Sequence, residues 1–279
     1  VNDARWKTLV EHCRVQIASL INSSAEEIAF VANTTEGLSR VVNGYRWQER
    51  DAVVVPKGEY ISNVLPWHTL ERRGVEVRNI QVAGPGICLS DIRGAVCKKT
   101  RIVALSAVHF STGWRADLAS LGAFCQERGI DLCVDGVQAV GVIPIDVKAM
   151  NISFLAAGGH KWLTGPQGSG FLYVAQDRQD LLTPSTAGWK SVERDVTAEI
   201  PDFLCDARRY ESGTGAVGAL VGLAAGGKII SALGIDAIAS HVQDVGSYLD
   251  EQLRRVDGQV ISRRTHDNWS GIVAFCTSN

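Results

Sequence analysis

Seven short apolar runs, separated by stretches of helical character, constrain the fold of this 279-residue chain more than any other feature. The runs cover residues 27–31, 52–55, 75–80, 101–106, 130–134, 152–157 and 170–174. The stretches with helical character cover residues 5–21, 38–42, 65–73, 90–98, 117–128, 216–227 and 235–255. Apolar strands that alternate with helices are typical of a mainly parallel sheet covered by helices on both faces. We therefore predict an α/β fold of this kind.

Local signals mark several boundaries. Asn33 or Thr34 suits the N-cap of a helix, and Gly74 and Gly129 suit positions just after helix ends. Residues 175–202 show little periodicity and are expected to form an ordered loop region, whereas residues 272–276 resemble a terminal strand. We find no internal repeat, low-complexity tract or linker.

Polar side chains follow five of the predicted strands. They are Thr34 and Thr35, Tyr60, Ser106 to His109, Asp135 with Gln138, and His160 with Lys161. In α/β sheets, ligands bind beyond the carboxyl ends of the strands. The sequence therefore predicts one ligand site at this edge of the sheet.

Lys161 and Asp135 are the two residues of this set with the clearest chemistry. Lys161 lies in a short turn between two apolar runs, where partial removal from water would lower its pKa and make its amine a nucleophile toward carbonyls. Asp135 ends a buried run. A lysine for a Schiff base and a buried acid for a pyridinium nitrogen form the pairing that pyridoxal phosphate (PLP) chemistry requires. Taken singly, each residue is better explained as an ordinary loop or turn residue.

Composition excludes several other classes. The net charge of −2 favours neither nucleic acid nor an anionic membrane, and no apolar run is long enough to span a bilayer. The first residues read as an amphipathic helix rather than a signal peptide. Seven scattered cysteines without a C-x-x-C pair argue against disulfides and zinc. We expect a cytoplasmic protein without a metal site.

The ordered motifs of this chain resemble those of the class V aminotransferase and cysteine desulfurase superfamily of PLP enzymes, fold type I. The motifs are Asn33-Thr34-Thr35-Glu36, Gly58-Glu59-Tyr60 with Asn63, Pro66 and Trp67, Val134 to Gln138, Gly159-His160-Lys161, Gly165-Pro166 with Gly168 and Gly170, and Glu211 with Gly213-Thr214. One motif would be weak, but six in the same order are a specific signal. The likeness covers the chain from about Arg5 to Cys276.

The resemblance implies a role for each site residue. Lys161 would form the Schiff base and move the Cα proton, and Asp135 would keep the pyridine nitrogen protonated. Gln138 would hydrogen-bond the phenolic oxygen of the cofactor, and Tyr60 would stack on its ring. The phosphate would be bound by Thr34, Thr35 and His160, and by Thr214 of a second subunit. That last contact implies a homodimer with shared active sites.

The chain also departs from the desulfurase pattern. Gly158 stands in place of a phosphate-binding serine, Tyr60 in place of a histidine, and Phe110 near the position of an asparagine. No cysteine falls in the position of the mobile sulfur acceptor. The resemblance further implies a PLP-binding large domain over residues 1–265 and the start of a truncated small domain over residues 266–279. The family's N-terminal segment and its substrate-carboxylate arginine are expected to be absent.

Three functions stay open at this point. The first is a PLP enzyme acting at Cα of an amino acid, a small-molecule substrate, most simply an aminotransferase. The second is a lyase, cysteine desulfurase or epimerase that shares the first proton abstraction. The third is a non-catalytic PLP-fold binding module. His109 follows a predicted strand and could face the cofactor, but a structural role is at least as compatible with its position. Arg115 and Arg209 could hold a carboxylate, but solvated surface charges explain them better.

Overall fold

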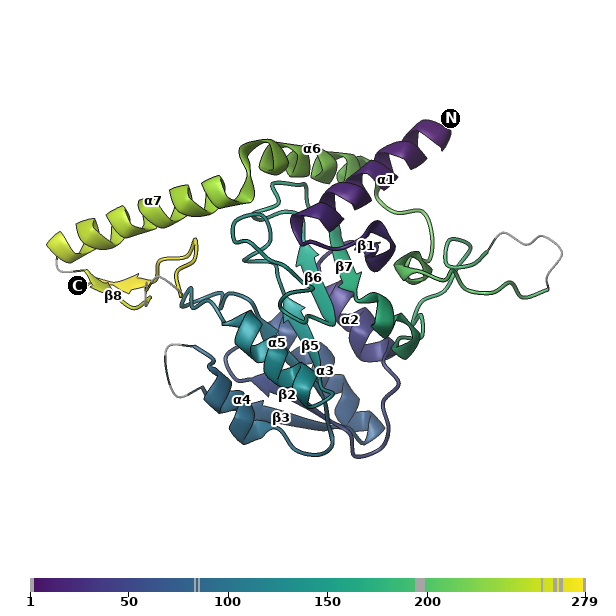
Figure 1. Cartoon of the computed structure of the whole chain (residues 1–279), viewed down its shortest axis with the longest axis horizontal. Helices are drawn as coiled ribbons and strands as arrows, with labels where there is room; N and C mark the ends of the chain where they lie inside the picture. Colours follow the sequence, from purple (N-terminus) through teal and green to yellow (C-terminus); the bar gives the residue numbers. More distant parts are fainter. Residues whose placement is uncertain are drawn as a thin grey trace.

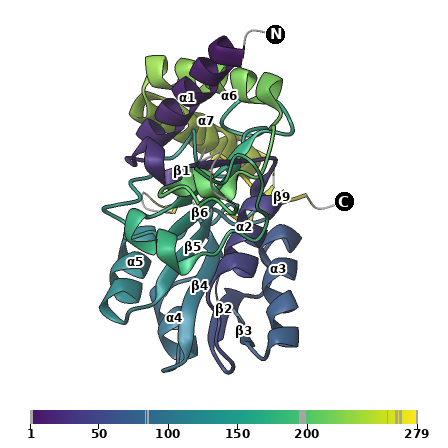
Figure 2. The same cartoon turned by 90° about the vertical axis from the view of Figure 1, so that its right-hand side faces the viewer.

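The chain folds around a seven-stranded sheet in the computed structural model, which describes residues 3–82, 84, 86–193, 199–256, 258–262, 265 and 268–277 (Figures 1 and 2). The strand order is β1-β7-β6-β5-β4-β2-β3. The strands are β1 (Ile28–Val31), β2 (Ala52–Pro56), β3 (Glu76–Ile80), β4 (Thr100–Ser106), β5 (Asp131–Asp135), β6 (Phe154–Gly158) and β7 (Gly170–Val174). Only β7 runs antiparallel to its neighbours. The predicted mainly parallel sheet is therefore confirmed.

Helices cover both faces of the sheet, as expected from strands that are buried throughout (Figure 2). The helices are α1 (Asp3–Leu20), α2 (Thr34–Gly44), α3 (Leu65–His68), α4 (Leu89–Ala95), α5 (Leu118–Glu127), α6 (Val217–Leu233) and α7 (Ile235–Arg255). Alternate strand residues point to opposite faces. One set packs with α1, α4, α5 and α6, and the other packs with α2, α3 and the 3₁₀ turn Thr69–Arg73. Two separate hydrophobic cores result.

Most predicted boundaries lie within a few residues of the observed ones. Gly74 and Gly129 adopt left-handed φ angles of 73° and 65°, as their positions after helix ends require. Asn33 is the N-cap of α2, because its side chain accepts a hydrogen bond from the Glu36 N–H at 2.9 Å. The residue 175–202 region contains a 3₁₀ turn, Gln176–Leu181, and the expected terminal strand shrinks to β9 (Phe275–Cys276), which pairs with β8 (Gln259–Val260).

The carboxyl-terminal part extends away from the sheet. Helix α7 leaves the body of the molecule after a bend of 83° from α6 (Figure 1). Among the described residues, no single helix is long and apolar enough to cross a membrane; only this bent pair together meets that test of length and composition. The predicted domain boundary at residue 266 stays a prediction. Of the residues beyond it, 266, 267, 278 and 279 lie outside the described part.

A buried ion pair fixes α1 against the β1 edge of the sheet. The Arg14 guanidinium, only 2 % exposed, donates to the Glu211 carboxylate at 2.7 Å and to the Ile28 carbonyl at 2.7 Å. The same Glu211 oxygen accepts the Phe30 N–H at 2.9 Å. Burial alone would lower the pKa of Arg14, but the carboxylates of Glu211 and Glu11 outweigh it and raise the pKa above its usual range. Arg14 therefore stays charged, and its partner is structurally required.

Replacement of Glu211 should destabilise the fold strongly. We expect Glu211→Ala to lower the free energy of unfolding by about 3 kcal/mol, because the buried Arg14 charge loses its main partner and the Phe30 N–H loses its acceptor. Equilibrium unfolding in urea, followed by tryptophan fluorescence, measures the change. Glu251→Ala, which removes the exposed partner of Arg255, is the matched control and should have little effect. Equal effects of the two variants would contradict the assigned role of the buried pair.

Candidate active site

The predicted convergence at the carboxyl edge of the sheet is observed. Strands β1, β2, β4, β5 and β6 all end at this edge, and β7 begins there. The ladder sets Ser106 of β4 opposite Asp135 of β5, and Asp135 opposite Ala156 of β6. The segments after these strand ends carry the residues proposed from the sequence. The backbone topology therefore accounts for the positions of these residues, whereas their roles depend on their side-chain contacts.

Asp135 is a buried acid that resists ionisation. It is 3 % exposed, and its Oδ1 accepts the Val137 N–H at 3.0 Å. Burial raises its pKa from 3.8 to about 7, and the negative charge of Glu59 adds to the rise, whereas the Val137 N–H and the Lys161 charge lower it. A carboxyl group in this state readily shares a proton with a basic nitrogen placed against it.

Lys161 lies in the turn that follows β6. The turn is closed by hydrogen bonds from the Gly159 N–H to the Ser169 carbonyl and from the Gly165 N–H to the Gly159 carbonyl, each 2.7 Å long. A Cβ atom on Gly159 would lie 2.5 Å from Ser169 Oγ, so only glycine fits there. The expectation that Lys161 is held out of bulk water is wrong for this chain. Its side chain is exposed, because the residue lies three positions beyond the buried end of β6.

The start of α2 meets the turn after β6. The Thr34 hydroxyl, buried in the structure, accepts the Gly158 N–H at 2.9 Å, whereas the exposed Thr35 hydroxyl donates to Ser62 Oγ at 2.7 Å. The first N–H groups of a helix have no partner within it and attract anions. The His160 ring lies over Gly158, because an added Cβ there would be 3.0 Å from His160 Nδ1 and Cε1. Glycine at position 158 thus makes room for the imidazole.

Tyr60 and Phe110 form an exposed aromatic pair at the same edge. Their ring centroids are 5.2 Å apart with an interplanar angle of 67°, and the two residues are 48 % and 40 % exposed. Gln138 is half-buried in the turn after Asp135. Tyr60 and Phe110 both differ from the desulfurase pattern, and they contact each other although they lie on different loops.

Thr214 is not part of this group within one chain. It lies exposed in the loop before α6, beside a separate cavity of about 300 Å³ that Ala32, Gly168 and Glu211 also line. A contact from Thr214 to the phosphate of a second subunit stays a prediction.

Sequence reasoning quoted Glu59 within a motif but gave it no role. Its carboxylate accepts the Ser106 N–H at 2.8 Å and also the Ser106 hydroxyl. His109, which had two open interpretations, is structural: its ring contacts the Gly58 carbonyl at 2.8 Å and Thr112 Oγ1 at 3.0 Å. The position of Glu59 after a strand end, next to Tyr60, was the signal that could have identified it.

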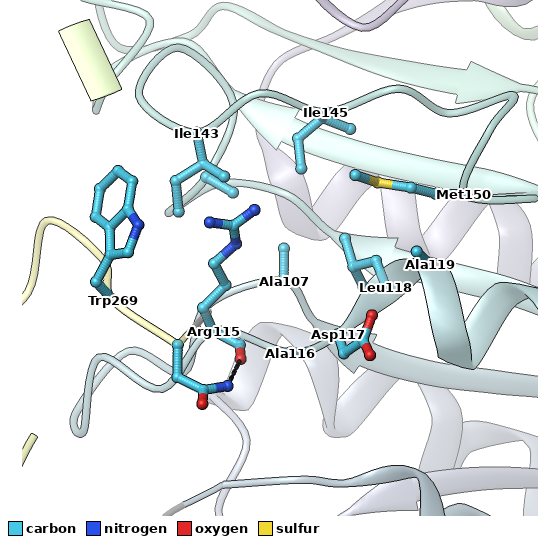
Figure 3. Close-up of a pocket in the computed structure, with 12 residues that line it drawn as sticks. Ala107, Arg115, Ala116, Asp117, Leu118, Ala119, Ile143, Ile145, Met150 and Trp269 are labelled. Atoms are coloured by element: carbon cyan, nitrogen blue, oxygen red, sulfur yellow. Dashed lines mark hydrogen bonds between the residues drawn. The ribbon is translucent and has the colours of Figure 1, made fainter. Parts of the chain in front are cut away.

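A cavity of about 550 Å³ lies behind the site (Figure 3). Ala107 and Ala139, which directly follow Ser106 and Gln138, line it. So do Ile143 and Ile145, and Arg115 extends into it toward them, 5.8 Å from the Trp269 ring centroid. Neither Lys161 nor Asp135 lines this cavity. It therefore adjoins the site from outside.

The donor set suits PLP. The N-terminus of α2 and the His160 ring offer an anion site for a phosphate, and Asp135 offers a buried acid for a pyridine nitrogen. Lys161 offers an accessible amine for an aldehyde, and Tyr60 an open aromatic face for a ring. In the described residues, no cluster of His, Cys, Asp and Glu could hold a metal ion.

The buried acid should make stability depend on pH. The folded chain keeps on Asp135 a proton that the unfolded chain releases near pH 3.8, so the stability that this proton contributes falls progressively above pH 3.8 and is fully lost once the pH exceeds about 7. Asparagine keeps the acceptor for Val137 but cannot ionise. We expect Asp135→Asn to stabilise the cofactor-free protein at pH 8 by on the order of 2 kcal/mol, and far less at pH 5.

Thermal unfolding of the cofactor-free protein at both pH values checks this prediction. Asp244→Asn removes an exposed carboxylate from α7 and is the matched control. A gain at pH 8 no larger than at pH 5, or no larger than in the control, would contradict it.

The Thr34 hydroxyl should be needed for the turn itself. Thr34→Val keeps the shape but leaves the buried Gly158 N–H without an acceptor, which should cost about 1–3 kcal/mol in the free energy of unfolding. Thr34→Ser keeps the hydroxyl and should retain most of the stability. Urea unfolding of both variants measures the difference, and equal losses would show that the hydrogen bond is unimportant.

Comparison with known proteins places this arrangement in a family. A model of the family "Aminotransferase class-V" matches residues 2–279. A probable cysteine desulfurase from Methanothermobacter thermautotrophicus is 32 % identical over 274 residues, which cover 97 % of this chain and 67 % of that protein. The chain thus spans about two thirds of the length of this relative.

Solved structures agree with the fold. The apo cysteine desulfurase from Thermococcus onnurineus is 28 % identical, with a TM-score of 0.90 over 98 % of this chain and 69 % of that chain. A lysine-to-alanine mutant with glycine covalently linked to its PLP cofactor is 23 % identical, with a TM-score of 0.89 over 95 % and 71 % of the two chains, and it shares the fold. Fold type I and the PLP cofactor, both expected from the sequence, are confirmed at the level of the family. The chain belongs to the class V aminotransferase family of PLP-dependent enzymes.

Proposed function

We propose that this chain is a PLP-dependent enzyme that abstracts the Cα proton of an amino acid, and that cysteine or another β-substituted amino acid is its substrate. One observation carries the reaction type: the buried acid Asp135 and the amine of Lys161 belong to adjacent strand ends at one edge of the sheet. The start of α2 meets the same turn. An amine, a proton-holding acid and an anion site are the three groups that PLP chemistry needs from a protein.

When bound, PLP supplies an electron sink that makes the Cα–H bond of an amino acid acidic. Asp135 would hold a proton against the pyridine nitrogen, which its buried position and high pKa favour. Lys161 would hold the cofactor through its amine and would accept and return the proton at Cα of the substrate. Its exposure in this chain leaves the amine open to both cofactor and substrate.

The remaining residues orient the cofactor. The α2 N–H groups, Thr35 and His160 would bind the phosphate, while Thr34 holds the turn that carries His160 and Lys161. Tyr60 would stack on the ring and Gln138 would hydrogen-bond its phenolic oxygen. In a homodimer, Thr214 of the second subunit adds a phosphate contact. The seven free cysteines agree with a reducing, cytoplasmic environment.

The substrate proposal rests on the relatives, which are named cysteine desulfurases. Loss of a sulfur substituent from Cβ begins with the same proton abstraction at Cα. A second candidate is transamination, which is the simplest outcome of that abstraction. It is favoured by the contact between Tyr60 and Phe110, which puts two apolar rings where desulfurases carry a histidine and an asparagine.

The first test asks whether Lys161 binds the cofactor. PLP-loaded protein is reduced with borohydride, digested, and mapped by mass spectrometry. We expect the reduced adduct on Lys161 in the wild-type chain and none in Lys161→Arg, which keeps the charge. Lys7→Arg is the matched control and should leave the adduct in place. An adduct on another lysine, or no adduct at all, would refute the proposed function.

The second test separates the candidate reactions by their products. The loaded protein is incubated with cysteine and with other amino acids, each with and without a keto acid. Release of sulfur or sulfide without a keto acid supports the cysteine substrate. Amino transfer that depends on the keto acid supports the second candidate, and cofactor binding without turnover of any amino acid supports a non-catalytic module.

A further inference from the structure

Three contacts join the segment Gly58–Tyr60 to the end of β4. The Glu59 carboxylate accepts the Ser106 N–H at 2.8 Å together with the Ser106 hydroxyl. The His109 ring contacts the Gly58 carbonyl at 2.8 Å through Nε2, and the Tyr60 ring packs against Phe110. The segments are about 50 residues apart in sequence, so only the fold brings them together.

The hydrogen bonds of His109 define which of its ring nitrogens carries the hydrogen. Its Nδ1 accepts the Thr112 N–H at 3.3 Å, so the proton of the neutral ring lies on Nε2 and is donated to the Gly58 carbonyl. Gly58 has a left-handed φ of 83°, which glycine adopts without strain. The turn after β2 is therefore fixed at two points: His109 holds the Gly58 carbonyl, and Ser106 holds the Glu59 carboxylate.

The same contacts connect Tyr60 to the buried acid. Ser106 is the ladder partner of Asp135, and the Ala107 N–H donates to the Asp135 carbonyl at 2.9 Å. Beyond Tyr60, its carbonyl accepts the Asn63 N–H at 2.7 Å and begins the 3₁₀ turn Ile61–Asn63. A shift of Glu59 would therefore move Tyr60 relative to Asp135.

We propose that Glu59 and His109 are positioning residues, which hold Tyr60 in a fixed position relative to Asp135 so that its ring can stack on the cofactor. The inference rests on the proposed function, because it needs PLP at this site. It adds that cofactor affinity depends on a carboxylate and an imidazole that act through the placement of Tyr60, apart from the effect of the Glu59 charge on the Asp135 pKa. A purely structural Glu59 would change stability without this dependence.

The first experiment uses the cofactor-free protein. Hydrogen exchange at the amides of Asn63 and Val64 reports the order of the turn after Tyr60. We expect Glu59→Ala and His109→Phe each to speed this exchange, while Glu59→Gln, which keeps an acceptor for the Ser106 N–H, stays close to wild type. Glu76→Ala, an exposed glutamate on β3, is the control and should leave the exchange unchanged. Unchanged exchange in both Glu59→Ala and His109→Phe would overturn the proposal.

The second experiment measures PLP affinity as a double-mutant cycle. Loss of two charge-assisted hydrogen bonds should weaken binding about tenfold in Glu59→Ala, and loss of the stacking ring should weaken it comparably in Tyr60→Ala. In the Tyr60→Ala background, Glu59→Ala should cause no further loss. Glu59→Gln should restore most of the affinity, and thermal unfolding verifies that each variant folds.

The outcomes distinguish the two proposals. Additive losses in the cycle, with normal PLP binding by the wild-type chain, would overturn the positioning role and leave the proposed function intact. Failure of the wild-type chain to bind PLP would overturn both. The hydrogen-exchange experiment uses the cofactor-free protein, so its result tests the positioning role whether or not the wild-type chain binds PLP.

Discussion

The backbone ladder through β4, β5 and β6 is the constraint on which the site depends. It sets Ser106 and Asp135, the last residues of β4 and β5, beside Ala156, which lies two residues before the end of β6. Because side chains alternate along a strand, a slip of one residue would turn Asp135 to the opposite face and exchange the two hydrophobic cores. All residues of these strands but one are buried, so such a slip would disrupt the packing against the helices on both faces. The packing of the sheet thus determines where the acid lies.

The two residues with the clearest chemistry differ in their access to water. Asp135 is enclosed, and burial supplies its raised pKa, whereas Lys161 stands in solvent beyond the strand end. This difference matches their tasks. An acid that shares a proton with a ring nitrogen benefits from low dielectric surroundings, while an amine that must meet both an aldehyde and a substrate needs an approach. The turn between β6 and β7 produces the difference, since its glycines let the chain leave the sheet within a few residues.

Much of the fold followed from local patterns. Buried runs predicted the seven strands of the main sheet to within a few residues, and Gly74 and Gly129 predicted helix ends. The long-range side-chain pairs could not be predicted from these local patterns. Arg14 and Glu211 are 197 positions apart, and Glu59 and Ser106 are 47 apart, so no periodicity or spacing connects them. The exposure of Lys161 was also missed, because apolar neighbours in sequence do not report which way a turn projects. The identities of the site residues were readable, whereas the contacts that hold them required coordinates.

The residues that depart from the desulfurase pattern contact one another or neighbouring residues of the site. Gly158 leaves space for the His160 ring, and the Thr34 hydroxyl accepts the Gly158 N–H, so the two neighbours of position 158 use the space and the backbone donor there. Tyr60 and Phe110 depart from the pattern on two loops and meet edge to face. An aromatic pair is more stable together than either ring alone in water, so the two substitutions support each other. The proton-holding acid and the lysine, by contrast, fit PLP without change. Differences in reaction among such chains are therefore to be sought in the loops after β2 and β4 rather than at Asp135 and Lys161.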